Sequence, residues 1–377
     1  MGESIARQVH ASGRDPVVVA RQLIDQLAAP DLRIAFVFAD RRLDPATLAA
    51  TQRVLGAPVV GCSTLGVIGG GATDGEPAAV ALGLYGDWLR VGVGVASELS
   101  KAALGRSHDA VHQAATQLGT TAGALDQGRH IAITMADGRC HHEEAFCIGS
   151  AAAAPKIRFV GGTASADLEG DDPTFVWTGG EARSDAAVVV VLDSEQPFHA
   201  VTSAHLVPTE LRTVVTAASG RVVDELDGRP AGPRLRQLIA GLGDQLDEPR
   251  PAHALARYID GVPYVRSIYR IDGPRLILAS AVETGHVLRV MRPGDLVATT
   301  RRDLAAAAER VGGTMAAFLA FSCTGRHTEA AMRGNAADLV SAYAAYPTIG
   351  FQTLSEQSGM LLVNHTLTGL AIGARRS

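Results

Sequence analysis

Hydrophobic residues of this chain fall mostly into short runs, and turns or helical patterns separate one run from the next. Apolar runs of about four to eight residues, bounded by turn residues, predict buried strands. Apolar residues three or four positions apart predict helices at Pro16–Leu27, Pro45–Val54 and His108–Leu118. This mixture predicts an α/β or α+β fold with mixed β-sheets flanked by helices. The strand-like runs include IAFVFAD, PVVGCST, AAVALGLYG, LRVGVGVAS, HIAITMAD and DAAVVVVLD.

The pattern changes near Arg221, where strand-like residues give way to Pro and Gly and then to a helix. Farther along, alternating residues predict a hairpin around Asp272-Gly273, and Asp303 is predicted to cap a helix over Leu304–Val311. A chain of 377 residues is long enough for two domains. We therefore predict three segments, namely an N-terminal helical segment over 1–29 and domains over 30–220 and 221–377.

Composition and charge narrow the class of protein. The chain has 34 basic and 39 acidic residues, a net charge of −5, which argues against nucleic acid as a partner. No run approaches the roughly 18 apolar residues of a membrane helix, and the first residues lack the apolar core of a secretion signal. The cysteines are therefore expected to stay reduced, and we expect a cytoplasmic protein without a membrane partner.

Two strand-like runs end in similar turns, VVGCSTLG and FVGGTASAD. Successive backbone N–H groups and hydroxyls in such turns can bind an anion or a carboxylate. The Lys of a P-loop and the dinucleotide pattern are both missing, so nucleotide binding is disfavoured. The alternative is a pair of tight turns without a ligand. The candidate ligand-binding residues are Gly61, Cys62, Ser63, Thr64, Gly66, Gly161, Gly162 and Thr163.

The segment from Cys140 to Cys147 holds the densest group of metal-ligand residue types, with two histidines and two glutamates between the cysteines. Its spacing does not suit a closed metal site, because adjacent side chains diverge. Glu143 and Glu144 instead suit the first turn of a helix, where the helix dipole favours acids, with Cys147 on the buried face. We therefore predict a helix start rather than a structural metal site.

Cys62 and Cys323 each end a strand-like run rich in Ser and Thr, which makes them candidate nucleophiles or ligand contacts. The sequence contains no Gly-x-Ser-x-Gly motif and identifies no base for either thiol. His205 follows another alternating run, and a histidine of this kind usually has a structural role. Residue chemistry alone therefore does not favour an enzyme. It leaves two roles open for His205, a hydrogen-bonded structural residue or a metal or haem ligand.

Longer stretches resemble a known family. The first half resembles the FIST sensory domain, and the second half resembles the C-terminal domain that accompanies it. The resemblance spans nearly the whole chain. It is carried by VVGCSTLGVI, MADG, FVGGTASAD and SDAAVVVVL in the first half, and by RVVDELDGRPA, FSCTGR and the last segment in the second.

Within this family the chain most resembles the NosP-type nitric-oxide-sensing haem proteins of bacteria, although FSCTGR is closer to the general FIST pattern. The resemblance implies a sensor that binds haem b, with His205 as the axial ligand, and detects nitric oxide. It further implies two-component or cyclic-di-GMP regulation, in which a separate histidine kinase or cyclic-di-GMP enzyme is the partner. The sequence leaves open whether the chain also forms a homo-oligomer. The matching stretches are AHLVPTELRTVVTAA, GVPYVRSIY, AVETGHVLRVMRPGDLV, GFQTLSEQ and NHTLTGLAIG.

Two alternatives stay open. The first is a FIST sensor without haem, whose ligand is small, polar and amino-acid-like. In it the two turns bind the ligand together with Arg326, whose guanidinium forms a fork for a carboxylate or for a haem propionate. The second alternative is an enzyme that uses Cys62 or Cys323 as its nucleophile.

Overall fold

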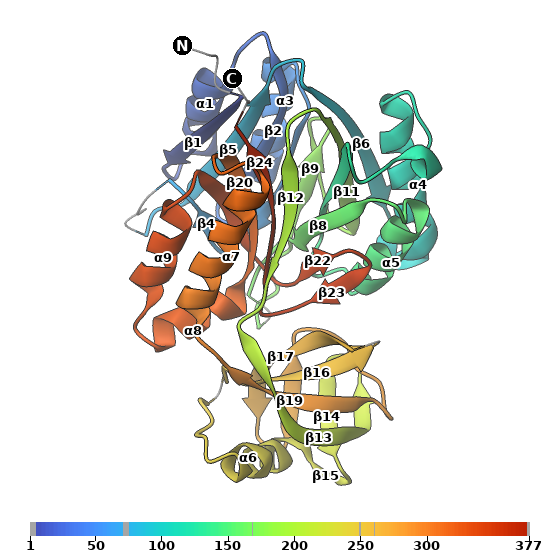
Figure 1. Ribbon diagram of the computed structural model, residues 1–377, viewed down its shortest axis with the longest axis vertical. Coiled ribbons are helices and arrows are strands. Elements are labelled where there is room, and N and C mark those ends of the chain that lie inside the picture. The colour runs from blue at the N-terminus through green and yellow to red at the C-terminus, as the bar shows by residue number, and fades with distance from the viewer. Residues whose placement is uncertain (1–4, 71–74, 168, 249, 260, 375–377) are drawn as a thin grey trace.

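The computed structural model describes residues 5–70, 75–167, 169–248, 250–259 and 261–374, which form a large body and a smaller barrel (Figure 1). The body contains three sheets with helices on its outer surface, and the barrel is formed by residues 206–293. The chain therefore completes the first sheet before it enters the barrel, and it returns to complete the second and third.

The first sheet has two parallel strands near its centre. In spatial order its strands are β1 (Ala6–Ser12), β5 (Ala78–Tyr85), β2 (Leu32–Asp40), β3 (Val59–Thr64), β9 (Val176–Thr178) and β10 (Glu181–Arg183). Its helices are α1 (Pro16–Leu27), α2 (Pro45–Ala49) and α3 (Thr51–Leu55). The parallel pair is β2 and β3. Helix α1 has the predicted bounds, and Asp15 caps it by accepting a 2.9 Å hydrogen bond from the backbone N–H of Val17.

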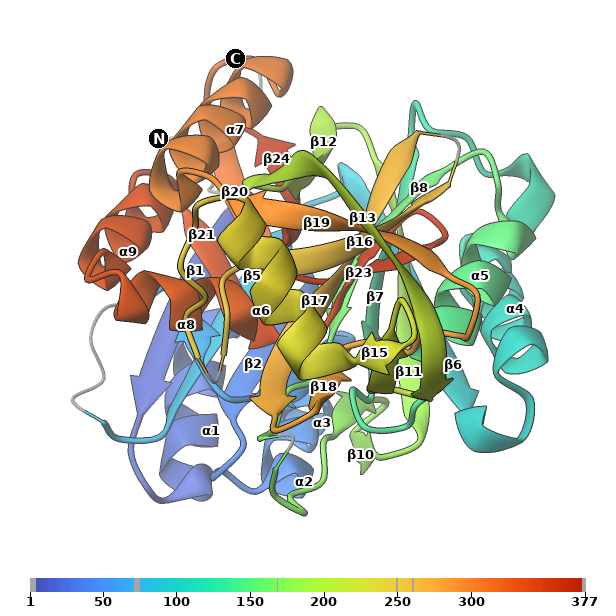
Figure 2. The same ribbon diagram turned by 90° about the horizontal axis from the view of Figure 1, so that it is seen from below.

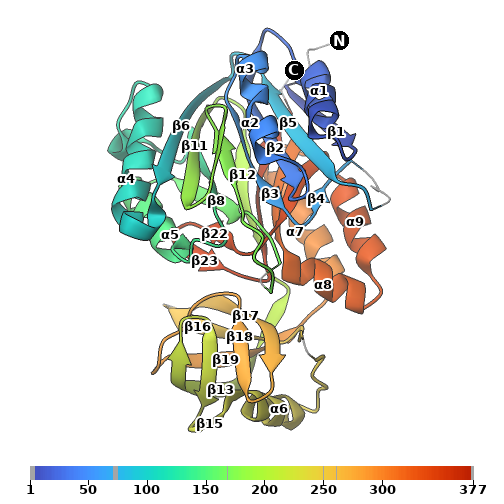
Figure 3. The ribbon, with the colours of Figure 1, turned by 180° about the vertical axis from the view of Figure 1, so that it is seen from behind.

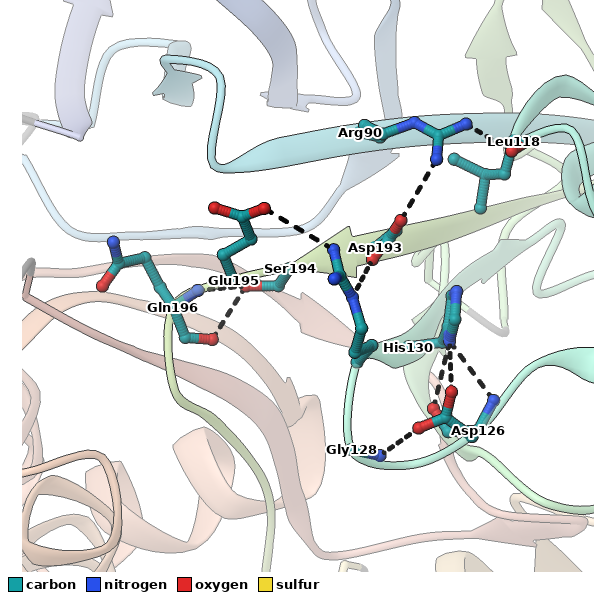
Figure 4. Close-up of polar contacts among 10 residues, drawn as sticks. Arg90, Leu118, Asp126, Gly128, His130, Asp193, Ser194, Glu195 and Gln196 are labelled. Carbon is teal, nitrogen blue, oxygen red and sulfur yellow. Dashed lines mark hydrogen bonds and ion pairs between the residues drawn. The ribbon is translucent and has the colours of Figure 1, made fainter.

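The second sheet repeats this pattern with β7 and β8 as its parallel pair. Its strands are β23 (Leu361–Val363), β22 (Glu356–Ser358), β8 (Arg158–Thr163), β7 (His130–Ala136), β11 (Ala186–Ser194) and β6 (Leu89–Ser97). Its helices are α4 (Leu99–Gln117), a short 3-10 turn at Ala122–Ala124, and α5 (Glu143–Ala153). At one end of the sheet, Asp193 on β11 accepts from Arg90 on β6 and, at 2.8 Å, from Arg129 beside β7 (Figure 4). These bonds tie three neighbouring strands together.

The third sheet has β20 and β21 as its parallel pair. Its strands are β12 (Phe198–Ser203), β24 (Leu367–Gly373), β20 (Met315–Cys323), β21 (Thr348–Thr353) and β4 (Val67–Ile68). Its helices are α7 (Leu296–Arg310), α8 (Thr324–Met332) and α9 (Ala336–Ala344). The predicted start of α7 at Leu304 is wrong. The helix begins two turns earlier and is capped by Asp295. The sequence pattern missed these two turns because β-branched residues in them are more typical of a strand.

The three sheets are one arrangement repeated, with a short strand exchanged between neighbours. Strand β4 follows β3 but pairs with β21, β9 follows β8 but pairs with β3, and β22 follows β21 but pairs with β8. The exchange closes the sheets into a ring. Figure 2 shows the helices in three groups around it, with α1–α3 in blue, α4 and α5 in teal, and α7–α9 in orange.

One glycine occupies the same place in each repeat. Gly61, Gly161 and Gly350 each lie opposite a residue of the neighbouring parallel strand. A Cβ atom at these positions would lie 1.6, 2.1 and 1.9 Å from the carbonyl oxygen of that residue. The similarity of VVGCSTLG and FVGGTASAD therefore reflects two of three equivalent strands.

The core of the body lies between the sheets. Aromatic rings from the first and third sheets meet there, with centroids 4.6 Å apart for Phe38 and Phe351 and 5.5 Å for Phe321 and Phe351. The predicted fold class, mixed sheets flanked by helices, is confirmed. Within the described ranges, none of the helices combines the length and hydropathy of a membrane-spanning helix.

The barrel lies below the body, as the view from behind also shows (Figure 3). Its strands, in spatial order, are β13 (Leu206–Ser219), β19 (Val287–Pro293), β16 (Ala254–Ile259), β17 (Val262–Asp272), β18 (Arg275–Leu278), β14 (Val222–Leu226) and β15 (Arg229–Pro230). The ring closes because β13 pairs with both β19 and β14, and α6 (Ala231–Gly241) packs against it. The predicted hairpin is confirmed by the pairing of Asp272 with Arg275. The predicted boundary at residue 220 falls inside the barrel, between β13 and β14.

Candidate functional site

A cavity of about 150 Å³ lies between the body and the barrel. Leu65, Ala166 and Leu354, just beyond β3, β8 and β21, form part of its wall, so all three repeats reach it. The first turn of α8 forms another part, and β17 closes the cavity from the barrel side. The barrel contributes Arg250, Ala252, Ser267, Ile268, Tyr269 and Ala279.

The two predicted turns lie close to this cavity, but their hydroxyls bind other parts of the protein. Thr64 Oγ1 donates to the backbone oxygen of Gln352 at 2.8 Å. Ser63 Oγ accepts from the backbone N–H of Phe175, and Thr163 Oγ1 accepts from that of Ser355, each at 3.0 Å. The turns therefore join the repeats to one another. Of the described residues on the cavity wall, none is among the candidates Gly61, Cys62, Ser63, Thr64, Gly66, Gly161, Gly162 and Thr163.

Helix α8 presents one face to the cavity, and Arg326 lies on the other. The cavity side carries Gly325, Thr328, Glu329 and Met332, spaced three or four positions apart as on one helix face. Arg326 is fully buried, donates from Nη2 to Thr300 Oγ1 at 2.7 Å, and is not among the described cavity residues. The structure therefore does not bring Arg326 and the Gly61–Gly66 turn together on one ligand-facing surface.

Both candidate cysteines are buried, but only Cys323 reaches the described cavity wall. Burial raises the pKa of Cys323, and it raises the pKa of Cys62 well above the ordinary range. A thiol in this state stays protonated near neutral pH and is a weak nucleophile. This environment does not support the cysteine-dependent enzyme.

His205 belongs to a buried cluster that the sequence did not reveal. It lies between β12 and β13, where the chain passes from the body to the barrel. Its Nε2 is 2.8 Å from Oε2 of Glu329 on α8, and Nε2 of His365, just before β24, is 2.8 Å from the same oxygen. Glu329 and His365 also line the cavity. The sequence analysis identified His205 but neither Glu329 nor His365, because nothing in the local pattern links these three positions.

The protonation states of the cluster follow from burial and hydrogen bonding. Burial lowers the pKa of His205 to about 4, so its ring is neutral near pH 7. Burial alone would raise the pKa of Glu329, but the hydrogen bonds from His205 and His365 outweigh it and lower this pKa to about 2. The cluster is therefore a carboxylate between two imidazole rings.

The predicted haem site does not fit this arrangement. The Nε2 atom of His205 is already hydrogen-bonded to Glu329, and the His205 side chain has no exposed surface. The cavity volume of about 150 Å³ is that of a cavity that holds a benzene-sized molecule, which is much smaller than a porphyrin. Haem binding through His205 would require both a wider cavity and a broken hydrogen bond.

The segment from Cys140 to Cys147 does start a helix, as predicted, and its acids also contact the barrel. Glu143 and Glu144 form the first turn of α5, and Cys147 is buried. Arg221 Nη2 lies 3.1 Å from Glu143 Oε1, and Arg266 Nη2 lies 2.8 Å from Glu144 Oε1. These ion pairs hold one side of the barrel against the body.

Fold and cavity together describe a two-part protein with a cavity between its parts. The FIST N domain is matched by residues 31–229 and the FIST C domain by residues 231–359, so the chain belongs to the FIST family. FIST domains are sensory, which makes this protein a small-ligand sensor in signal transduction and fits the prediction that it is not an enzyme.

No curated protein matches the sequence significantly. Among solved structures, the cyanuric acid hydrolase from A. caulinodans is similar over 99% of both chains, with 13% sequence identity and a TM-score of 0.38. A TM-score this low supports no argument about activity.

Proposed function

We propose that this protein senses a small, polar, amino-acid-like molecule in the cavity between the body and the barrel. The observation that carries the proposal is that both parts supply the cavity wall, with Thr328 from the body and Ser267 from the barrel. A ligand that contacts both parts favours the arrangement in which they are held together. A signalling partner, either a histidine kinase or a cyclic-di-GMP enzyme, then reads that arrangement.

The chemistry of the wall suits a molecule with both a carboxylate and an amino group. Thr324 and Gly325 are the first residues of α8, and the N-terminus of a helix favours negative charge. Asp167 and Glu329 place carboxylates on the same wall, which favours an ammonium group. Apolar side chains supply the rest of the enclosure, as is usual for small-molecule sites.

One contact shows how occupancy would reach the barrel. Tyr269 on β17 donates its hydroxyl to Asp167 Oδ1 at 2.9 Å, and both residues line the cavity. An ammonium group bound by Asp167 would compete with the Tyr269 hydroxyl for this carboxylate and so change the link between body and barrel. Ligand binding at this wall is therefore coupled to a contact between the two parts.

We expect at least one free amino acid or small carboxylate to raise the melting temperature of the protein, because a ligand at about 100 times its Kd stabilises the folded state by about 2.7 kcal/mol. Thr328→Phe should abolish this rise, since the ring would fill the cavity. Ala331→Phe, at an exposed position of α8, is the matched control and should respond like the unaltered protein. A panel without any stabilising compound, or a rise that survives in Thr328→Phe, would contradict the proposal.

Haem-based sensing of nitric oxide is the second candidate, and it requires the cavity to widen and the hydrogen bond between His205 and Glu329 to break. Haem b would supply the iron to which nitric oxide binds. If the protein binds haem specifically, the ferrous form should show a sharp Soret band that shifts with nitric oxide and is lost in His205→Ala. His253→Ala, which removes another buried histidine, is the control. A broad spectrum of loosely bound haem in the unaltered protein would rule out this candidate.

A further inference from the structure

The cluster of His205, Glu329 and His365 has the geometry of a metal site. One ligand atom from each residue lies within 4.8 Å of the others, and all three residues are buried. Metal–nitrogen and metal–oxygen bonds of about 2.0–2.2 Å place neighbouring ligand atoms roughly 3 Å apart. The two measured Nε2–Oε2 separations of 2.8 Å are close to that value.

We propose that His205, Glu329 and His365 bind a divalent first-row transition-metal ion, such as Zn²⁺ or Fe²⁺, at the hinge between the body and the barrel. Two imidazoles and one carboxylate form the ligand set of several zinc sites and of non-haem iron sites. The three residues come from the hinge, α8 and the segment before β24, so folding alone brings them together. The metal site does not rest on the small-molecule ligand proposed above, but the two share Glu329, so a metal ion and an ammonium group would compete for that carboxylate.

The second contacts of each ligand are consistent with this role. Arg333 Nε lies 3.1 Å from Oε1 of Glu329, which leaves Oε2 directed at both rings. Ser267 Oγ lies 3.4 Å from Nδ1 of His365 and helps to orient that ring. Nδ1 of His205 is buried without a hydrogen-bond partner in the described structure, whereas Nε2 donates its hydrogen to Glu329. Metal binding therefore requires this hydrogen to move to Nδ1, which leaves a lone pair on Nε2 for the ion.

Charge sets the expected affinity. Glu329 is the only carboxylate in the triad, and Arg333 partly offsets it. Arg326 adds positive charge that also acts on His205. We therefore expect weaker binding than at a closed zinc site with several thiolates.

The proposed site borders the cavity. Glu329 and His365 line it, so a molecule in the cavity would lie next to an ion that these residues hold. Three protein ligands with an open position are typical of metal sites that exchange a bound molecule. The metal would thus be accessible from the cavity.

Titration of chelator-treated protein with Co²⁺ and Zn²⁺ tests this proposal. We expect about one equivalent of either ion to bind, visible d–d absorption with Co²⁺, and no Soret band. Glu329→Gln and His365→Gln should each lower affinity by more than the roughly 10–100-fold that follows loss of an outer-shell partner. His253→Gln removes a buried histidine whose Nε2 contacts Asp244 at 3.0 Å, and it should bind as the unaltered protein does.

Two readouts keep the test decisive even if a variant folds poorly. Zn²⁺ should raise the melting temperature of the unaltered protein and of His253→Gln, and it should leave both triad variants unchanged. Binding of much less than one equivalent by the unaltered, folded protein would overturn the proposal. Unchanged affinity in folded Glu329→Gln or His365→Gln would overturn it as well.

Discussion

Replacing Gly61 with alanine should lower the free energy of unfolding by about 3 kcal/mol or more, at the upper end of the cost of overpacking a core. The new Cβ would lie 1.6 Å from the backbone oxygen of Val37 and 2.6 Å from Nε1 of Trp177. Neither group can move easily, because β2 is paired on both sides and Trp177 is buried. Chemical denaturation followed by circular dichroism measures the change.

The repeat makes the prediction stronger, because equivalent positions should respond alike. Gly161→Ala and Gly350→Ala place a Cβ 2.1 and 1.9 Å from a backbone oxygen and should also be strongly destabilising. Gly105→Ala is the matched control, since no described atom lies within 4 Å of its added Cβ. Gly105 lies within α4, so this change should stabilise the protein by up to about 1 kcal/mol. If Gly61→Ala cost no more than the control, the close approach of the strands would be disproved.

Local pattern was sufficient to predict much of the fold. Helix α1 was predicted with its observed bounds, because Asp15 and Pro16 mark its start and apolar residues recur on one face. The hairpin at Gly273 was predicted from its alternating residues and its turn. The start of α7 was not, since Thr299 and Thr300 belong to a β-branched stretch whose helical state depends on tertiary packing.

The threefold arrangement was only partly visible in the sequence. The run around Gly61 resembles the run around Gly161, but the third run has Phe351 and Gln352 after Gly350. What the repeats share is the glycine and the backbone register, and register is a property of paired strands. Exchange of the short strands between sheets depends on contacts between distant segments, which periodicity cannot predict.

The candidate site was missed for a similar reason. His205 was identified, but its partners Glu329 and His365 lie 124 and 160 positions away in the sequence, at 329 − 205 and 365 − 205. Residues this far apart in the sequence show no local pattern that would predict that they meet in the folded protein. Arg326 was assigned to the cavity because it follows a strand, whereas α8 begins at Thr324 and turns the Arg326 side chain away from the cavity wall.

Glu356 should make the protein less stable as the pH rises through neutrality. Burial in β22 raises its pKa to about 7, although Thr353 and Thr366 oppose the shift by hydrogen bonding to the carboxyl group. The folded state therefore retains a proton, between about pH 4.5 and pH 7, that the unfolded state releases. The stability contributed by this proton is complete below pH 4.5 and is lost as the pH rises through 7. The total loss is on the order of 3 kcal/mol.

Comparison with Glu356→Gln isolates this effect, because the amide keeps the shape of the side chain but does not titrate. His205, whose lowered pKa gives stability that rises between about pH 4 and pH 6.5, acts equally in both proteins. The free energy of unfolding of Glu356→Gln relative to the unaltered protein should therefore increase by about 2–3 kcal/mol between pH 5 and pH 8. Chemical denaturation at several pH values measures this difference. A difference that stays constant across the interval would show that Glu356 is already ionised at pH 5 in the folded protein.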